Sequence, residues 1–174
     1  MRLTSYHAPG SGPTYGLVLD GGILDLGARL GDRCPDLRSL LAEPGVLPTV
    51  EKLADHQPDH DLDDVAFLPV IPDPAKIICV GLNYEDHRVE AGLPLTSHPA
   101  LFLRTPDSQT GHRAPILRPK ESTSLDYEAE LAVIVGRGGR RIPAGQALEH
   151  VAGYACYNDA VSYTHLTLPT NREV

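Results

Sequence analysis

Apolar and polar residues alternate between Tyr15 and Leu26, and Asp20 and Gly21 interrupt the run. An Asp-Gly pair between two alternating segments is the strongest short-range signal for a β-hairpin. Leucines then recur at helical spacing in residues 36–42, and residues 48–54 show a second short segment of this kind. The pattern predicts a small β-rich unit followed by two short helices.

The next stretch, residues 55–64, is polar and has no apolar period. Its aspartates and its two histidines have the composition of a metal cluster, but no spacing among them fixes a coordination geometry. A solvated linker is the favoured interpretation.

Beyond this linker, a helix is expected between two strands. Asn83 is a suitable N-cap, Gly92 suits the left-handed position after the last turn, and Pro94 prevents continuation. Glycines after residue 135 resemble a phosphate loop, but no long helix follows them, so a turn is favoured. Strands are expected at residues 76–81, 99–104, 114–117, 125–135 and 151–159, with a short helix at 144–150. The chain is therefore of the α+β class.

The formal net charge is −8, and the densest basic group, Arg137, Arg140 and Arg141, falls in a glycine-rich turn. We therefore expect no nucleic-acid partner and no membrane partner. No apolar stretch reaches membrane-spanning length, and the start lacks the hydrophobic segment of a signal peptide. The three cysteines lack metal-ligand spacing and suggest a reducing compartment, so a cytoplasmic protein is expected.

Two carboxylates, Glu128 and Glu130, lie two residues apart in an apolar segment that continues to Val135. Side chains alternate between the faces of a strand, so both point to the same side, with Cα atoms roughly 7 Å apart. Two like charges that leave water together are costly unless a cation accompanies them. The pair is therefore either a metal site or a solvent-facing stripe, and the apolar character of the strand favours the metal site.

His87 and Glu90 lie three residues apart on one face of the expected helix. Such a pair is either a catalytic histidine with an orienting carboxylate or a surface ion pair. The sequence by itself favours the surface pair.

The order of these segments resembles that of the fumarylacetoacetate hydrolase family. The resemblance rests on residues 76–84, His87 with Glu90, residues 99–102, residues 126–131 and residues 151–159. It implies a small N-terminal β-rich domain with short helices and the linker, residues 1–65. The first part of a β-roll catalytic domain would follow in residues 66–160.

The resemblance also implies a metal-dependent enzyme that acts on keto or diketo acids. Glu128, Glu130 and Asp159 match the positions that hold Mg²⁺ or Mn²⁺, and an all-oxygen ligand set suits such hard cations. His87 and Glu90 match a catalytic lid pair that positions or activates water. Arg104 falls near the substrate, where many members have a lysine. The expected partner is a small keto or diketo acid, and the full-length parent is expected to be a homodimer.

The leading reaction is cleavage of a C–C bond in an acylpyruvate or related β-diketo acid, through an enolate that the metal stabilises. A 2-keto-4-pentenoate hydratase or an isomerase-decarboxylase of aromatic catabolism uses the same enolate and remains an alternative. An alternative of another class is a non-catalytic fragment or binding module with a decayed site, although the intact carboxylates argue against decay.

The last segment departs from the family pattern. Residues 161–170 match, residue for residue, the translation of a transposase sequencing adapter. We therefore expect residues 161–174 to be a non-native adapter-derived tail. On this interpretation the chain is C-terminally truncated and inactive by itself, and His165 is not a ligand.

Overall fold

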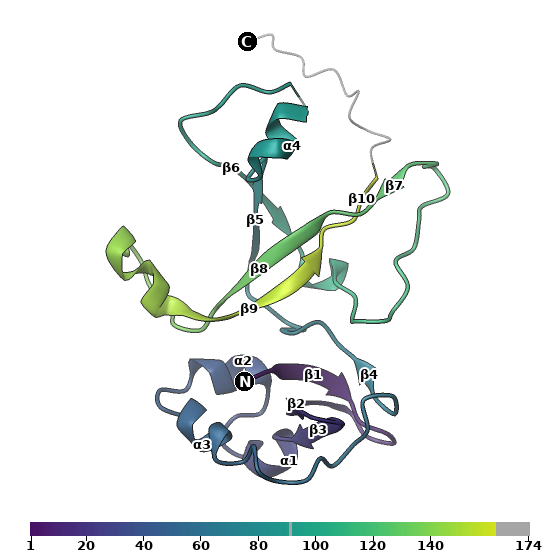
Figure 1. Cartoon of the computed structure of the whole chain (residues 1–174), viewed down its shortest axis with the longest axis vertical. Coiled ribbons are helices and arrows are strands. Elements are labelled where there is room, and N and C mark those ends of the chain that lie inside the picture. Colours follow the sequence, from purple (N-terminus) through teal and green to yellow (C-terminus); the bar gives the residue numbers. More distant parts are fainter. Residues whose placement is uncertain (91, 163–174) are drawn as a thin grey trace.

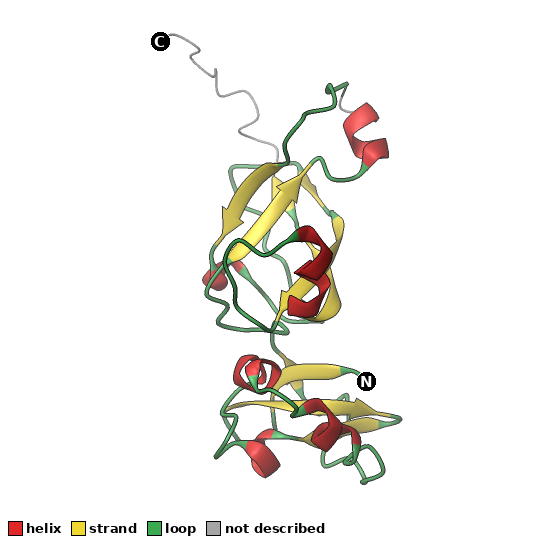
Figure 2. Ribbon diagram, turned by 90° about the vertical axis from the view of Figure 1, so that its left-hand side faces the viewer, coloured by secondary structure: helices red, strands yellow, loops and turns green. Residues whose placement is uncertain are grey.

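The computed structural model describes residues 1–90 and 92–162, which form two units stacked along the long axis of the molecule (Figures 1 and 2). The first unit contains an antiparallel sheet in the order β3-β2-β1-β4. Its strands are β1 (Leu3–His7), β2 (Pro13–Leu19), β3 (Gly22–Asp25) and β4 (Ala66–Phe67). Leu19 pairs with Gly22, and Gly21 in the intervening turn has a φ of 87°, which glycine adopts without strain. The predicted hairpin is confirmed.

Three short helices, α1 (Gly27–Leu30), α2 (Leu37–Ala42) and α3 (Leu47–Glu51), accompany this sheet. Asp36 and Ser39 form a capping box at the start of α2, which satisfies backbone N–H groups that the helix leaves without partners. The helices pack apolar side chains against the sheet, and full burial stabilises such side chains by about 1.5–3 kcal/mol each. The core contains Tyr15, Leu17, Leu24, Leu26, Cys34, Leu37, Leu40, Val46 and Val50.

The segment of residues 55–64 is attached to the first unit and is not a free linker. The backbone N–H of Ile23 donates to the carbonyl of His60, and the N–H of Asp59 donates to the carbonyl of Ile23. Strand β4 then pairs with β1, and the Ser5 hydroxyl donates to the carbonyl of Val70. The N-terminal sheet thus continues a few residues past the predicted boundary at residue 65, because backbone pairing that the polar composition did not reveal holds this stretch in place.

Within the described part of the chain, the second unit contains three two-stranded ladders, β5-β6, β8-β9 and β7-β10. Residues 114–117, where the sequence predicted a strand, form none. Among the described residues, no helix is long and apolar enough to cross a membrane. The strands are β5 (Ile77–Gly81), β6 (Ala100–Arg104), β7 (Leu125–Asp126), β8 (Ala129–Val135), β9 (Val151–Asn158) and β10 (Val161–Ser162). The helices are α4 (Glu85–Glu90), η1 (Pro106–Ser108) and η2 (Ala144–His150).

The long ladders β5-β6 and β8-β9 each have a more covered inner face and an exposed apolar outer face. Alternation along β8 places Glu130, Ala132 and Ile134 inward, whereas Leu131 is 60 % exposed on the other side. The strand that the sequence predicted at residues 125–135 forms as two segments, β7 and β8, and Glu128 lies in the break between them. The apolar outer face of β8 is not buried within the described residues. The outer faces carry Ile78, Val80, Leu101 and Leu103 on one ladder and Leu131, Val133, Val135 and Tyr154 on the other.

The expected tail, residues 161–174, begins within the described residues. Val161 and Ser162 form β10 and pair with Asp126 and Leu125 of β7. The remainder, residues 163–174 with His165, lies outside the described residues.

Candidate functional site

Glu128 and Asp159 are adjacent at one end of the β8-β9 ladder. The backbone N–H of Asp159 donates to the carbonyl of Glu128 at 2.9 Å, and the N–H of Glu128 donates to Oδ1 of Asn158 at 3.0 Å. Glu130 follows two residues later, opposite Tyr157 on the neighbouring strand. The antiparallel pairing therefore brings together the three sequence positions predicted to hold a metal.

Arg104 reaches this end of the ladder from β6. Its Nη2 lies 2.7 Å from Oδ1 of Asp159, and Asp159 is only 8 % exposed. The guanidinium also lies over the ring of Phe102, 5.6 Å from its centroid, while its Nε is buried without a hydrogen-bond partner among the described residues. A buried carboxylate needs a nearby positive charge, and Arg104 supplies it here.

Cys79 and Tyr157 complete the inner wall of the site. Burial raises the pKa of both side chains, and the negative charge of Asp159 raises each of them further, while the positive charge of Arg104 acts in the opposite direction. Both groups therefore stay neutral and protonated near pH 7. The sequence pattern indicated no site role for Cys79, since the cysteines lack metal-ligand spacing, and it did not single out Tyr157. Strand pairing was the missing signal, because it places Tyr157 directly across from Glu130.

The three predicted carboxylates do not converge on one point in this structure. Among the described residues, no three His, Cys, Asp or Glu side chains are placed to hold a common metal ion, and Asp159 points to Arg104. The chemistry of the donors nevertheless suits a hard divalent cation, because three carboxylates lie on adjoining strand ends and Glu128 and Glu130 are partly buried. The residues thus fit Mg²⁺ or Mn²⁺ in chemical type, and the side chains must rearrange to hold either ion.

His87 and Glu90 lie on the exposed helix α4, away from the ion pair. Arg104 pairs with Ile77 at the start of β5, whereas α4 follows Gly81 at its end, a separation of roughly 13 Å along the strand. Among the described residues, the side chains of His87 and Glu90 make no hydrogen bond or ion pair. The ion pair of α4 instead joins Glu85 and Arg88 at 2.6 Å.

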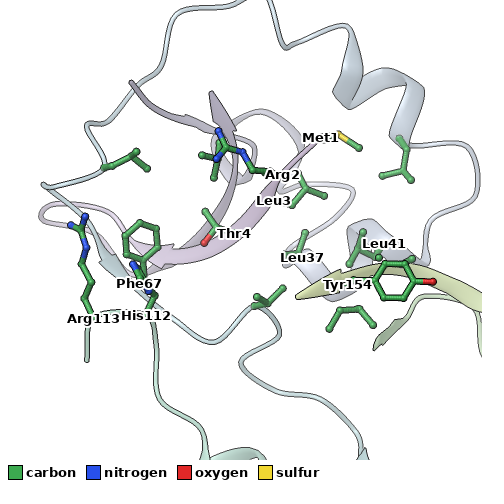
Figure 3. Close-up of a pocket in the computed structure, with 17 residues that line it drawn as sticks. Met1, Arg2, Leu3, Thr4, Leu37, Leu41, Phe67, His112, Arg113 and Tyr154 are labelled. Carbon is green, nitrogen blue, oxygen red and sulfur yellow. The ribbon is translucent and has the colours of Figure 1, made fainter. Parts of the chain in front are cut away.

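A separate cavity of about 520 Å³ lies between the two units (Figure 3). Leu37 and Leu41 of α2 and Tyr154 of β9 form part of its apolar wall, and Arg2 and Arg113 are among its basic side chains. None of the six residues predicted to form the site lines it. The cavity and the carboxylate cluster are therefore different features of the molecule.

The sequence-family model for the fumarylacetoacetate (FAA) hydrolase C-terminal domain matches residues 76–168 of the chain. The chain belongs to the fumarylacetoacetate hydrolase family. The resemblance noted in the order of sequence segments is thus confirmed, and the family members among its relatives and structural neighbours include enzymes named as tautomerases, hydrolases and isomerases.

Several of the curated relatives are named as oxaloacetate tautomerases. The mitochondrial FAHD2A protein of Bos taurus is 36 % identical over 165 residues, which cover 91 % of this chain and 52 % of the relative. YisK of Bacillus subtilis is 43 % identical over 104 residues, which cover 58 % of this chain and 35 % of that protein. The chain spans about half the length of the full-length FAHD2-type relatives it matches.

Solved structures of the same fold extend the comparison. Maleylpyruvate hydrolase from Sphingobium sp. SYK-6, solved in complex with manganese(II) and pyruvate, has a TM-score of 0.74 at 25 % identity, over 94 % of this chain and 60 % of that one. A putative HpcE protein from Mycobacterium smegmatis has a TM-score of 0.72 at 30 % identity, over 92 % of this chain and 56 % of that one. This chain and these structures share a mixed helix and strand content, as the sequence predicted.

Proposed function

We propose that a protein of the relatives' length containing this chain is a divalent-metal-dependent enzyme that interconverts the keto and enol forms of a small 2-keto acid, with oxaloacetate as the leading substrate. The observation that carries the proposal is that strand pairing brings the backbone positions of Glu128, Glu130 and Asp159 together at one end of the β8-β9 ladder. Arg104 lies beside them and pairs with Asp159. The names of the curated relatives supply the substrate class.

The carboxylates and Arg104 have complementary roles in this proposal. When bound by Glu128, Glu130 and Asp159, Mg²⁺ or Mn²⁺ supplies a Lewis acid that stabilises the negative charge of an enolate. Arg104 offers planar N–H donors that suit a substrate carboxylate. Tyr157 and Cys79 are neutral near pH 7, so they add no negative charge that would repel the anionic substrate.

The proton moves between C3 of the keto acid and the enol oxygen. We assign its transfer to His87, with Glu90 as the group that orients the imidazole. This assignment requires α4 to close over the carboxylates, since the helix is exposed in the structure. Gly81 before α4, and Gly92 after it with a φ of 65°, are residues at which the backbone direction changes readily.

Hydrolysis of an acylpyruvate is the second candidate. The fold similarity to maleylpyruvate hydrolase, which was solved with manganese(II) and pyruvate, favours it. Both reactions pass through an enolate beside a carboxylate, so the same residues serve both. The homodimeric state, the role in aromatic catabolism and the cytoplasmic location remain predictions, and the mitochondrial names of several relatives make that compartment an alternative.

The deciding experiment compares the two reactions in the full-length protein. We expect Mn²⁺-dependent conversion of enol-oxaloacetate to the keto form, followed by its ultraviolet absorbance, and loss of this activity in Glu130→Gln. Glu149→Gln is the matched control, because Glu149 is exposed and pairs with Arg137 away from the site. Metal-dependent turnover that survives Glu130→Gln would show that the ligand assignment is wrong. Turnover of an acylpyruvate without turnover of oxaloacetate would select the second candidate.

A further inference from the structure

The ion pair between Arg104 and Asp159 occupies the carboxylate on which metal binding depends. Nη2 of Arg104 lies 2.7 Å from Oδ1 of Asp159, and Asp159 is the most buried of the three acidic residues. In this conformation, no three potential ligands among the described residues converge. The Asp159 carboxylate therefore either pairs with Arg104 or binds a cation, and these are alternative arrangements of its side chain.

The surroundings of Arg104 indicate that its guanidinium group has a second arrangement, in which it leaves Asp159. Its Nε is buried and lacks a hydrogen-bond partner among the described residues, and a buried donor left without a partner is unfavourable. The ion pair with Asp159 is made through Nη2, at 2.7 Å from Oδ1. A bidentate partner such as a substrate carboxylate would satisfy Nε and Nη2 together.

We propose that Arg104 is a cation-exchangeable latch on Asp159. A divalent cation displaces the guanidinium from Asp159, and the released Arg104 then binds the carboxylate of the keto acid. The latch gives an order to binding, with metal first and keto acid second, and it holds Asp159 in a stable pairing while no metal is present. This inference rests on the proposed function and makes Arg104 a substrate-binding residue that couples the binding of the two ligands.

The positive charge of Arg104 favours its displacement by the cation over the binding of both to Asp159. Removing a positive charge from a partly buried site strengthens the binding of a cation there, because the repulsion and the competition for Asp159 both disappear. If Arg104 merely oriented Asp159 for the metal, its removal would weaken metal binding. The direction of the change in affinity therefore separates the two roles.

The test measures Mn²⁺ affinity on the 174-residue chain by titration calorimetry and by the electron paramagnetic resonance signal of free Mn²⁺. We expect Arg104→Gln to bind Mn²⁺ about tenfold more tightly than the wild type, a change of about 1.4 kcal/mol. Arg104→Lys, which keeps the charge, should bind Mn²⁺ with nearly wild-type affinity. Arg113→Gln removes another Arg–Asp pair, with Asp63, at an exposed position and should leave Mn²⁺ affinity unchanged.

Pyruvate provides the second readout. In the Mn²⁺-loaded wild type, pyruvate should bind at least tenfold more tightly than in Mn²⁺-loaded Arg104→Gln, and Arg104→Lys should restore part of the difference. Equal or weaker Mn²⁺ binding in Arg104→Gln would overturn the latch and leave the proposed function intact. A folded chain in which neither the wild type nor Arg104→Gln binds Mn²⁺ would overturn the latch, and the same result in a protein of the relatives' length would overturn the proposed function as well.

Chemical modification of arginines in the wild-type protein tests the latch without any substitution. Phenylglyoxal modifies accessible arginines, and mass spectrometry reports the modified fraction at each site. Mn²⁺ should increase the modification of Arg104 several-fold and leave that of Arg113 unchanged. Bound Mn²⁺ with no change at Arg104 would contradict the latch.

Discussion

Nη1 and Nη2 of Arg29 donate hydrogen bonds to the two carboxylate oxygens of Asp59, at 2.6 and 3.0 Å. The same carboxylate accepts the backbone N–H of Asp25 at 2.7 Å. Asp59 thus fastens residues 55–64 to both α1 and the end of β3, and a segment with the composition of a linker becomes part of the N-terminal unit.

Replacing Asp59 with Asn should reduce the free energy of unfolding by about 1 kcal/mol at pH 7, since the pair is partly exposed and solvent screens it. The hydrogen bond from Arg29 lowers the pKa of Asp59 in the folded state. A lowered folded-state pKa stabilises the protein above the unfolded-state pKa, about 4, and this contribution disappears as pH falls through the folded value. The difference between wild type and Asp59→Asn, measured by urea denaturation, should therefore shrink below about pH 4.

The control for this measurement is Asp63→Asn. Asp63 pairs with Arg113 but its side chain is 85 % exposed, so we expect a change below about 0.5 kcal/mol. Equal effects of the two substitutions would show that the Arg29–Asp59 contact has no special role.

Gly16 should not tolerate a side chain. A Cβ there would lie 2.6 Å from the carbonyl oxygen of Leu24 and would also meet the side chain of Ile23, contacts that require backbone movement. Gly16→Ala should lower the free energy of unfolding by about 1–3 kcal/mol, as overpacking does elsewhere. Gly138→Ala, where nothing lies within 4 Å, should be neutral or slightly stabilising. Thermal unfolding of the two variants checks the prediction, and an unaffected Gly16→Ala would contradict the close packing of β2 on β3.

The apolar outer faces of the second unit should make the isolated chain self-associate. Leu103 is 72 % exposed and lies beside Leu101 on the outer face of β6, and Val133 is exposed on β8. Contiguous apolar patches and strand edges of this kind promote association. The double variant Leu103→Lys and Val133→Lys should reduce both the mass measured by light scattering and the binding of a hydrophobic dye. A chain that is already monodisperse and monomeric would refute this expectation.

His87→Ala in the full-length protein should lower turnover by roughly a hundredfold, because a general base contributes on this scale. Mn²⁺ affinity, measured separately, should stay within about twofold of wild type, since His87 lies away from the carboxylates in the described structure. His98→Ala removes an exposed histidine that contacts Ser97 outside the site and serves as the control. Unchanged turnover in His87→Ala would return His87 and Glu90 to the alternative of a surface pair.

Local sequence signals identified much of the chain correctly. The Asp20-Gly21 turn, helix α2 and the strands β5, β6, β8 and β9 follow from turn chemistry, leucine spacing and alternation, which act between near neighbours. Residues 114–117 have apolar character but form no strand, because a strand also needs a partner that the sequence pattern does not name.

The sequence by itself determined the alternation of side chains along β8, which places Glu130 on the same face as Ala132 and Ile134, whereas Glu128 lies just before the strand. Only the tertiary structure decided that Asp159 pairs with Arg104, that Tyr157 lies across from Glu130, and that Asp59 binds Arg29. The physical reason is that alternation depends on covalent spacing, which the sequence contains. The partner of a buried charge depends on which strands meet, and this depends on the packing of segments far apart along the chain.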